Sequence, residues 1–305
     1  MIEPRSARLL RSAVPLAGAT VLAEIAYPLV RGSGRGSAAL TVLTVILFAM
    51  TSVTHAVLTR GRRAGVALMA VFGGGGLLAE AVGVATSAPF GRYAYTGSLG
   101  PRLFGVPAVV PLAWVMMAWP AYLVALRLTS GRGVVVPLGR LRVPLVRVLV
   151  AAWALASWDL FLDPQMVAAG RWRWTDPAPT LPGVPAVPLG NYLGWVVVAT
   201  VLMAVLAAAL AGTVPGDSGP ADAGASPDVT AGWAVTRDAV PYGLYLWTYG
   251  SSVLAHVAFF GVPAAAGWGA AGMGIVAVPL AVSLSRPTAG FSRRHGVSPI
   301  RDGGS

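Results

Sequence analysis

Long apolar stretches alternate with short polar ones along most of the chain. A helix that crosses a bilayer needs roughly 20 predominantly apolar residues, and eight stretches of the chain meet this requirement. Only Gly261 and Val262 separate the last two stretches, which could form one tight hairpin, so the pattern predicts an all-α, polytopic membrane helix bundle of seven or eight helices. The eight stretches are 13–30, 38–58, 64–85, 107–128, 144–163, 190–212, 240–260 and 263–284.

The polar segments between these stretches are of two kinds. Residues 86–106 and 164–189 combine Pro and Gly with Tyr, Trp and Arg. Irregular backbone is tolerated at membrane depth only where it packs on protein or lines a cavity, so we expect these two outer loops to form a lid over the bundle. Residues 213–238 are rich in Gly, Pro, Ala and Asp, which predicts a flexible linker, and 286–305 are expected to be a disordered basic tail. Apart from these, residues 1–305 form a single membrane domain.

Composition supports the membrane class, because 56% of the residues are hydrophobic and only 11% are charged. The formal net charge of +11 first suggests nucleic-acid binding. However, all 22 basic residues are arginines in short clusters between apolar runs, where they contact lipid head groups rather than form one basic groove. Sixteen of them fall on the side that holds both chain ends and six on the other. The positive-inside rule therefore predicts a multi-pass cell-membrane protein with both termini in the cytoplasm and no nucleic-acid partner.

Several polar side chains interrupt the predicted helices near one end of the bundle. Asp159 and Asp163 are four residues apart, so they lie on one face of a helix. A charged group at the bilayer centre costs about 2.5–3.5 kcal/mol on insertion scales, so such residues usually face the bundle interior and mark a functional path. The alternating topology gathers six candidates at similar depth in the outer half: Glu24, Glu80, Asp159, Asp163, Asn191 and His256.

Each candidate also has a structural alternative. Glu80 follows a run of glycines that favours close helix approach, so it could be a buried acid hydrogen-bonded between packed helices. His256 has an apolar setting and could be a satisfied core histidine, while His55 lies away from the cluster. Asp159 and Asp163 could instead lie at the interface and pair with head-group water or with an arginine, such as Arg92, Arg171 or Arg173.

Aromatic residues accompany the acids. Tryptophans at helix ends normally anchor the membrane interface, and this role alone could account for Trp114, Trp119, Trp153, Trp195 and Trp247. Trp158, in contrast, adjoins Asp159, and further aromatic residues lie in or beside the outer loops: Tyr93, Tyr95, Trp172, Trp174 and Tyr192. A carboxylic acid among aromatic faces suits protonation of an olefin, because the acid gives the proton and the rings stabilise the resulting cation.

Two runs carry a family resemblance. The stretches that begin "EAVGVATSAPFGRYAYTGSLGPRLFGVP" at Glu80 and "WDLFLDPQMVAAGRWRWTDP" at Trp158 resemble the CruF-type carotenoid biosynthesis membrane proteins, the bisanhydrobacterioruberin hydratases and their γ-carotene 1'-hydroxylase relatives. The resemblance covers most of 64–212. It implies a hydratase of the carbon–oxygen lyase class, which adds water across the terminal isopropylidene double bond of an acyclic carotenoid end and gives a tertiary alcohol. The matching positions are Glu80, Pro89, Phe90, Gly91, Tyr93, Tyr95, Trp158, Asp159, Asp163, Pro164, Asn191 and Tyr192.

This chemistry assigns expected roles. Asp159, kept neutral by its apolar surroundings, is expected to protonate the alkene, and Asp163 or Glu80 to orient the water that captures the cation. We expect neither a cofactor nor a metal. The expected partners are the lipid bilayer, a carotenoid substrate that is fifty-carbon or similar to γ-carotene or lycopene, and other enzymes of that pathway. The expected substrate-binding residues are Trp158, Tyr93, Tyr95, Phe90, Asn191, Tyr192, His256 and Glu24.

Three other functions remain open. The spacing of Asp159 and Asp163 resembles the Asp-x-x-x-Asp magnesium-diphosphate motif of membrane prenyltransferases. A carotenoid end-group cyclase would use the same acid and cation but exclude water. A lipid or proton transporter would use the carboxylates as a relay and make no product.

Overall fold

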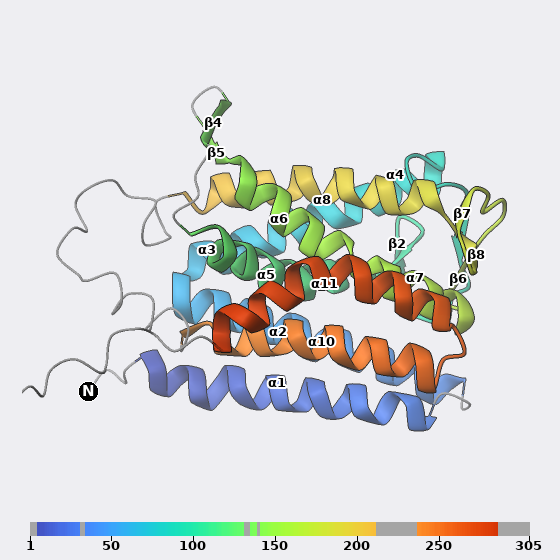
Figure 1. The fold of residues 1–305 in the computed structure, drawn as a ribbon, viewed down its shortest axis with the longest axis horizontal. Helices are drawn as coiled ribbons and strands as arrows, with labels where there is room; N and C mark the ends of the chain where they lie inside the picture. Colours follow the sequence, from blue (N-terminus) through green and yellow to red (C-terminus); the bar gives the residue numbers. More distant parts are fainter. Residues whose placement is uncertain (1–4, 31–33, 131–134, 139–140, 212–236, 286–305) are drawn as a thin grey trace, which may run out of the picture.

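The computed structural model describes residues 5–30, 34–130, 135–138, 141–211 and 237–285. Its long helices run side by side along one axis, which confirms the predicted all-α membrane bundle (Figure 1). The predicted linker, 213–238, and the predicted tail, 286–305, lie outside the described residues, except for Arg237 and Asp238. These two residues directly precede a helix, and Asp238 is buried.

Seven helical segments of the described chain are long and apolar enough to cross a membrane. An eighth helix, α10, has 20 residues but is not among them, so the predicted range of seven to eight holds. It pairs with α11 across the short turn that the sequence indicated. The helices are α1 (Arg5–Val30), α2 (Arg35–Arg60), α3 (Arg62–Leu68), the π-helix η2 (Met69–Gly74), α4 (Gly75–Thr86), α5 (Val110–Thr129), α6 (Leu145–Ala156), α7 (Asp159–Ala168), α8 (Leu189–Ala209), α10 (Ala239–Ala258) and α11 (Pro263–Ser285).

The fifth predicted helix differs from its prediction in two respects. It is interrupted between α6 and α7, and it continues to Ala168 instead of ending at Asp163. At the interruption, the amide of Trp158 donates to the carbonyl of Leu155 and that of Phe161 to Trp158, three residues back, so the chain tightens locally in 3₁₀ fashion. The two acids of this segment therefore begin a short helix of their own.

The two outer loops pair with each other at one end of the bundle, as the predicted lid requires (Figure 1). β1 (Tyr93–Tyr95) is antiparallel to β6 (Trp172–Trp174), although the two strands come from different loops. Hairpins β2 (Arg102–Leu103) with β3 (Val106–Pro107) and β7 (Thr180–Leu181) with β8 (Val184–Pro188) complete this end. A further hairpin, β4 (Val135–Leu138) with β5 (Leu141–Pro144), lies at the opposite end.

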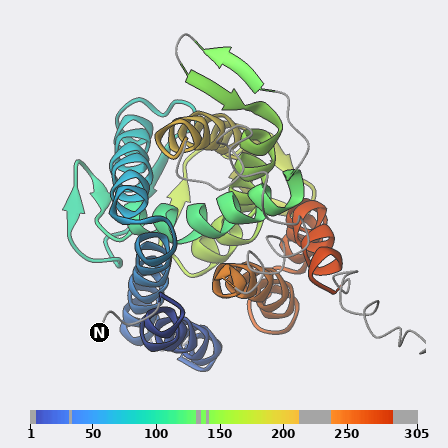
Figure 2. The same ribbon diagram turned by 90° about the vertical axis from the view of Figure 1, so that its left-hand side faces the viewer.

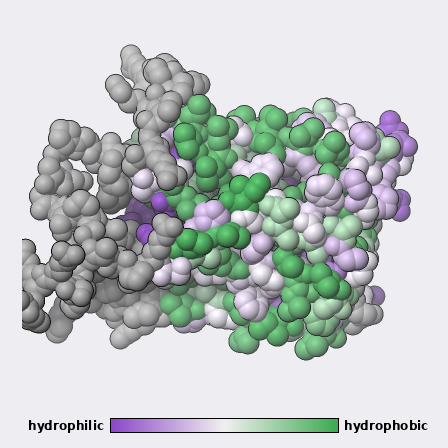
Figure 3. Space-filling model, viewed as in Figure 1, coloured by the Kyte–Doolittle hydropathy of each residue, from purple (hydrophilic) through white to green (hydrophobic). Residues whose placement is uncertain are grey.

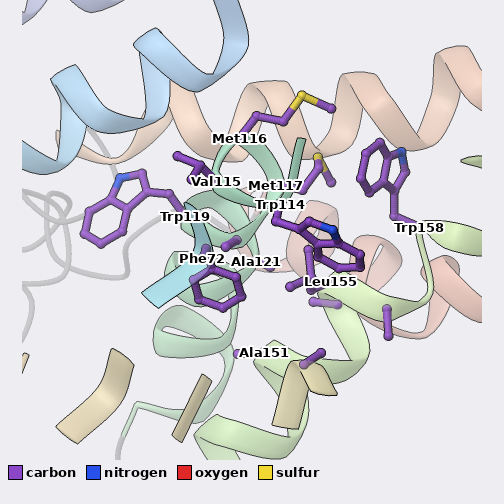
Figure 4. Close-up of a cluster of buried hydrophobic side chains, with 14 of the residues drawn as sticks. Phe72, Trp114, Val115, Met116, Met117, Trp119, Ala121, Ala151, Leu155 and Trp158 are labelled. Carbon is purple, nitrogen blue, oxygen red and sulfur yellow. The ribbon is translucent and has the colours of Figure 1, made fainter. Parts of the chain in front are cut away.

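Helix α5 forms the centre of the bundle. It is buried along most of its length and contacts α2, α6, α10 and α11 (Figure 2). Its side chains Trp114, Val115, Met117 and Trp119 supply much of the apolar core (Figure 4). The outer helices expose large apolar side chains such as Leu22, and hydrophobic surface extends over their flanks (Figure 3). Such a surface suits contact with lipid.

Candidate active site

A cavity of about 470 Å³ is lined by residues of the helices and of the paired strands β1 and β6 of the outer loops. Carboxyl groups from three different helices line it: Glu24 of α1, Glu80 of α4, and Asp159 and Asp163 of α7. Glu80, Asp159 and Asp163 are 4%, 1% and 5% exposed, so we name these three residues the acid cluster. The structure thus brings together the three residues that the sequence marked as catalytic.

Glu80 is held by two tyrosines of the lid. The hydroxyl of Tyr93 donates to Glu80 Oε2 at 2.6 Å and that of Tyr95 donates to the same oxygen at 2.7 Å. Alternate residues of a strand face the same side, so the Tyr-Ala-Tyr sequence of β1 directs both hydroxyls at one carboxylate. Burial, and next the negative charge of Glu80, raise the pKa of each tyrosine well above its ordinary value. Both hydroxyls therefore keep their protons and act as donors.

Glycines of the third helical segment make room for this arrangement. A Cβ atom at Gly83 would lie 3.0 Å from the hydroxyl of Tyr93, and one at Gly76 would lie 3.1 Å from Cδ1 of Trp114. Real Cβ atoms rarely approach so closely, so the glycines permit Tyr93 and Trp114 to reach the cavity. The predicted role of the glycine run, close helix approach, agrees with the contact between Gly76 of α4 and Trp114 of α5.

The two acids of α7 have different surroundings. Asn191, at the start of α8, donates from Nδ2 to Asp163 Oδ2. Asp159 Oδ2 is buried and has no hydrogen-bond partner among the described residues, and the same is true of the hydroxyl of Tyr192. Burying a polar group without a partner costs free energy, so Asp159 is the member of the acid cluster that is free to engage a ligand.

The acid cluster has no arginine partner within the described part of the chain. The groups that act electrostatically on Asp159 and Asp163 are the other acids of the cluster. Arg171 is buried nearby in sequence, but its Nη2 donates to Ser37 Oγ at 2.7 Å. The alternative in which the two aspartates lie at the interface beside an arginine is therefore wrong, because both carboxyls are enclosed by the bundle.

Aromatic rings cover the cavity. In the β1–β6 ribbon, Tyr93 lies opposite Trp174 with ring centroids 5.8 Å apart, and Tyr95 lies opposite Trp172 at 5.7 Å. All four rings line the cavity, as does Trp158. The sequence placed Trp172 and Trp174 near the acids but did not mark them as site residues. Their alternation in Trp-Arg-Trp, which matches Tyr-Ala-Tyr, is the signal that could have done so.

The interface-anchor interpretation is wrong for four of the helix tryptophans. Trp114 and Trp195 are 4% and 5% exposed, lie 3.8 Å apart between ring centroids, and line the cavity. Trp119 is fully buried and donates to His55 Nδ1 at 3.0 Å. Trp247 lines the cavity and donates to Glu24 Oε2. Each indole points inward because it has a packing or hydrogen-bond partner within the bundle.

The remaining predicted residues differ in whether they line the cavity. Asn191 and Glu24 line it. Phe90 is buried behind the wall, stacked 4.1 Å from the Trp195 ring, and Tyr192 is not among the lining residues. His256 is fully buried and is not among the lining residues; its Nε2 lies 2.9 Å from the carbonyl of Phe161 and its Nδ1 2.7 Å from that of Ser252, a setting that favours the core-histidine alternative.

Comparison with known proteins identifies a family for the chain. Residues 39–220 match the carotenoid biosynthesis protein family, which is more than half of the chain and includes the acid cluster. A bisanhydrobacterioruberin hydratase from Haloarcula japonica is 35% identical over 139 residues, which cover 44% of this chain and 41% of that protein. The chain thus spans about two fifths of the relative's length. No solved structure matches. The chain belongs to the carotenoid biosynthesis protein family.

Proposed function

We propose that the protein is a membrane enzyme that hydrates the terminal isopropylidene double bond of an acyclic carotenoid end group. One observation carries the proposal: a buried carboxyl, Asp159, has an unpartnered oxygen at a cavity that two further acids and several aromatic rings line. Hydration of an alkene needs an acid, a setting that tolerates a cation, and a positioned water. The name of the Haloarcula relative points to the same reaction.

In the proposed reaction Asp159 carries its proton, since an isolated carboxylate is costly to bury. It gives this proton to the terminal alkene, and the electron pair of the double bond forms the new C–H bond. The tertiary cation that results lies among the rings of Tyr93, Tyr95 and Trp158, whose π-faces stabilise positive charge. The carboxylate left on Asp159 adds a second source of stabilisation.

Water then captures the cation. Asp163 or Glu80 orients this water and accepts one of its protons as the new C–O bond forms. Asn191 holds Asp163 in place, and the two tyrosines hold Glu80. Transfer of that proton back to Asp159 restores the starting state, so the net change is addition of one water.

Pigment analysis tests the proposal. The gene is expressed in cells that accumulate lycopene, γ-carotene or a fifty-carbon carotenoid lacking terminal hydroxyls, and the pigments are separated by liquid chromatography with mass detection. We expect a product heavier by one water, and its loss in Asp159→Ala with the protein still in the membrane. A product of unchanged mass would indicate cyclisation instead. Absence of any new pigment, with the protein present, would contradict the proposal.

A further inference from the structure

Among the described residues, the exposed part of the cavity lining is confined to one flank of the bundle. Of the residues that line the cavity, those that are exposed all come from two neighbouring segments: Ile25 and Leu29 of α1, Leu254 of α10, and Phe259 at the end of α10. Their exposed fractions are 50%, 81%, 62% and 50%. The lining residues contributed by other elements are buried or half-buried. We name these four residues the mouth.

The mouth faces sideways from the bundle. Helices α1 and α10 lie side by side along one flank, and the mouth lies in their halves nearest the lid (Figure 1). All four mouth residues are apolar, and hydrophobic surface covers this flank (Figure 3). A surface of this kind in a membrane-spanning protein contacts lipid chains rather than water.

The cavity is also too small for a whole carotenoid. A volume of about 470 Å³ is within the range of pockets that hold one drug-sized molecule. A carotenoid end group with the first part of its polyene would fill this space, so the rest of the chain must extend outside the protein. The acid cluster lies on α4 and α7, whereas the mouth lies on α1 and at the end of α10.

We infer that the mouth is a lateral entrance, through which the carotenoid enters from the bilayer end first and in which its polyene stays during reaction. This inference rests on the proposed function for the identity of the substrate. A hydrogen bond from Trp247 to Glu24 links α10 to α1 within the same cavity wall. It fixes the separation of the two helices that form the entrance.

The absence of cysteine from the natural chain allows a direct test. Leu254→Cys places one thiol in the mouth. Ile275→Cys is the matched control, because Ile275 of α11 is 63% exposed but does not line the cavity. Each variant, in liposomes, is labelled with benzophenone maleimide, mixed with carotenoid and irradiated. Polyene absorbance that stays with the denatured protein reports whether the chain lies beside the label.

We expect roughly tenfold more crosslinked polyene from the labelled Leu254→Cys variant than from the labelled Ile275→Cys variant, and a loss of hydration on labelling only in the first. Equal crosslinking from both positions would contradict the inferred entrance, even if the unlabelled protein hydrates carotenoid. Selective crosslinking at position 254 without any hydration by the natural protein would support the entrance and count against the proposed function. The two ideas can therefore fail separately.

Discussion

Two clusters of buried polar side chains lie at opposite ends of the bundle, and they differ in whether their carboxyl groups have cation partners. At the end away from the lid, Arg60 donates from Nη1 and Nη2 to the two carboxylate oxygens of Asp238, each at 2.6 Å. His55 lies 3.8 Å from the same carboxylate, and its Nε2 is 2.9 Å from the carbonyl of Arg237. We name Arg60, Asp238 and His55 the arginine cluster.

The acid cluster at the other end contains three carboxyls and, among the described residues, no cation partner. In the arginine cluster both carboxylate oxygens of Asp238 already accept hydrogen bonds from Arg60, so this carboxylate is engaged within the protein. Three carboxyls that share a cavity without a cation are costly to bury, and such groups are found mostly at functional sites. The comparison indicates that the arginine cluster joins helices, whereas the acid cluster is the one available for the proposed reaction.

The largest expected effect comes from removing the acid. Asp159→Asn keeps the shape of the side chain but removes the proton donor, so we expect hydration to fall by a factor of ~10²–10⁴, the usual contribution of general acid catalysis. The melting temperature in detergent should stay the same or rise, because an uncompensated acid is lost. Hydration at the natural rate would show that the donor is another group.

The same substitution in the arginine cluster should have the opposite outcome. Asp238→Asn leaves the buried guanidinium of Arg60 without a counter-charge, and we expect a loss of about 3–5 kcal/mol in the free energy of unfolding. Denaturation in detergent measures this loss. Arg60→Gln combined with Asp238→Asn removes both charges and should recover part of the stability. If Asp238→Asn unfolds like the natural protein, the pair is not a structural link.

The sequence predicted the acid cluster but not the arginine cluster. The spacing of Asp159 and Asp163 and the depth of Glu80 identified the acid cluster, because intramembrane acids stand out against apolar neighbours. Asp238 was assigned to a flexible linker, since composition alone describes a Gly- and Pro-rich segment and does not reveal one buried ion pair within it. Its partner, Arg60, was counted only as an arginine at a helix end.

The inward direction of the tryptophans could not be predicted. Helix α5 is apolar on all sides, so its hydrophobic pattern does not indicate which side faces lipid, and Trp114 was read as an interface anchor. The pairing of β1 with β6 joins loops about 80 residues apart in the chain. Such long-range pairing depends on how the helices pack and is not encoded in either loop alone.

A smaller effect is expected from the donors that hold the acid cluster. Tyr95→Phe removes one of the two hydrogen bonds to Glu80 and keeps the ring. We expect turnover to fall about tenfold, which corresponds to ~1.4 kcal/mol and to the loss of one good hydrogen bond. Tyr249→Phe is the control, because that hydroxyl donates to the carbonyl of Ala270 and does not line the cavity. Equal losses in both variants would assign the effect to general packing.

The smallest expected effect is a change at low pH in the stability that the arginine cluster contributes. Burial tends to raise the pKa of Asp238, but the hydrogen bonds from Arg60 and the charges of Arg60, Arg237 and His55 outweigh it, so the pKa lies below its ordinary value. A carboxyl with a lowered pKa in the folded state contributes stability that is complete above its unfolded pKa, about 3.9, and is lost as the pH falls through the folded value.

The difference in unfolding free energy between the natural protein and Asp238→Asn should therefore be constant near neutral pH. Below about pH 4 it should shrink, by at most about 1.4 kcal/mol per pH unit. Denaturation in detergent between neutral pH and about pH 3 measures this difference, and a difference that grows on acidification would contradict the ion pair assigned to the arginine cluster.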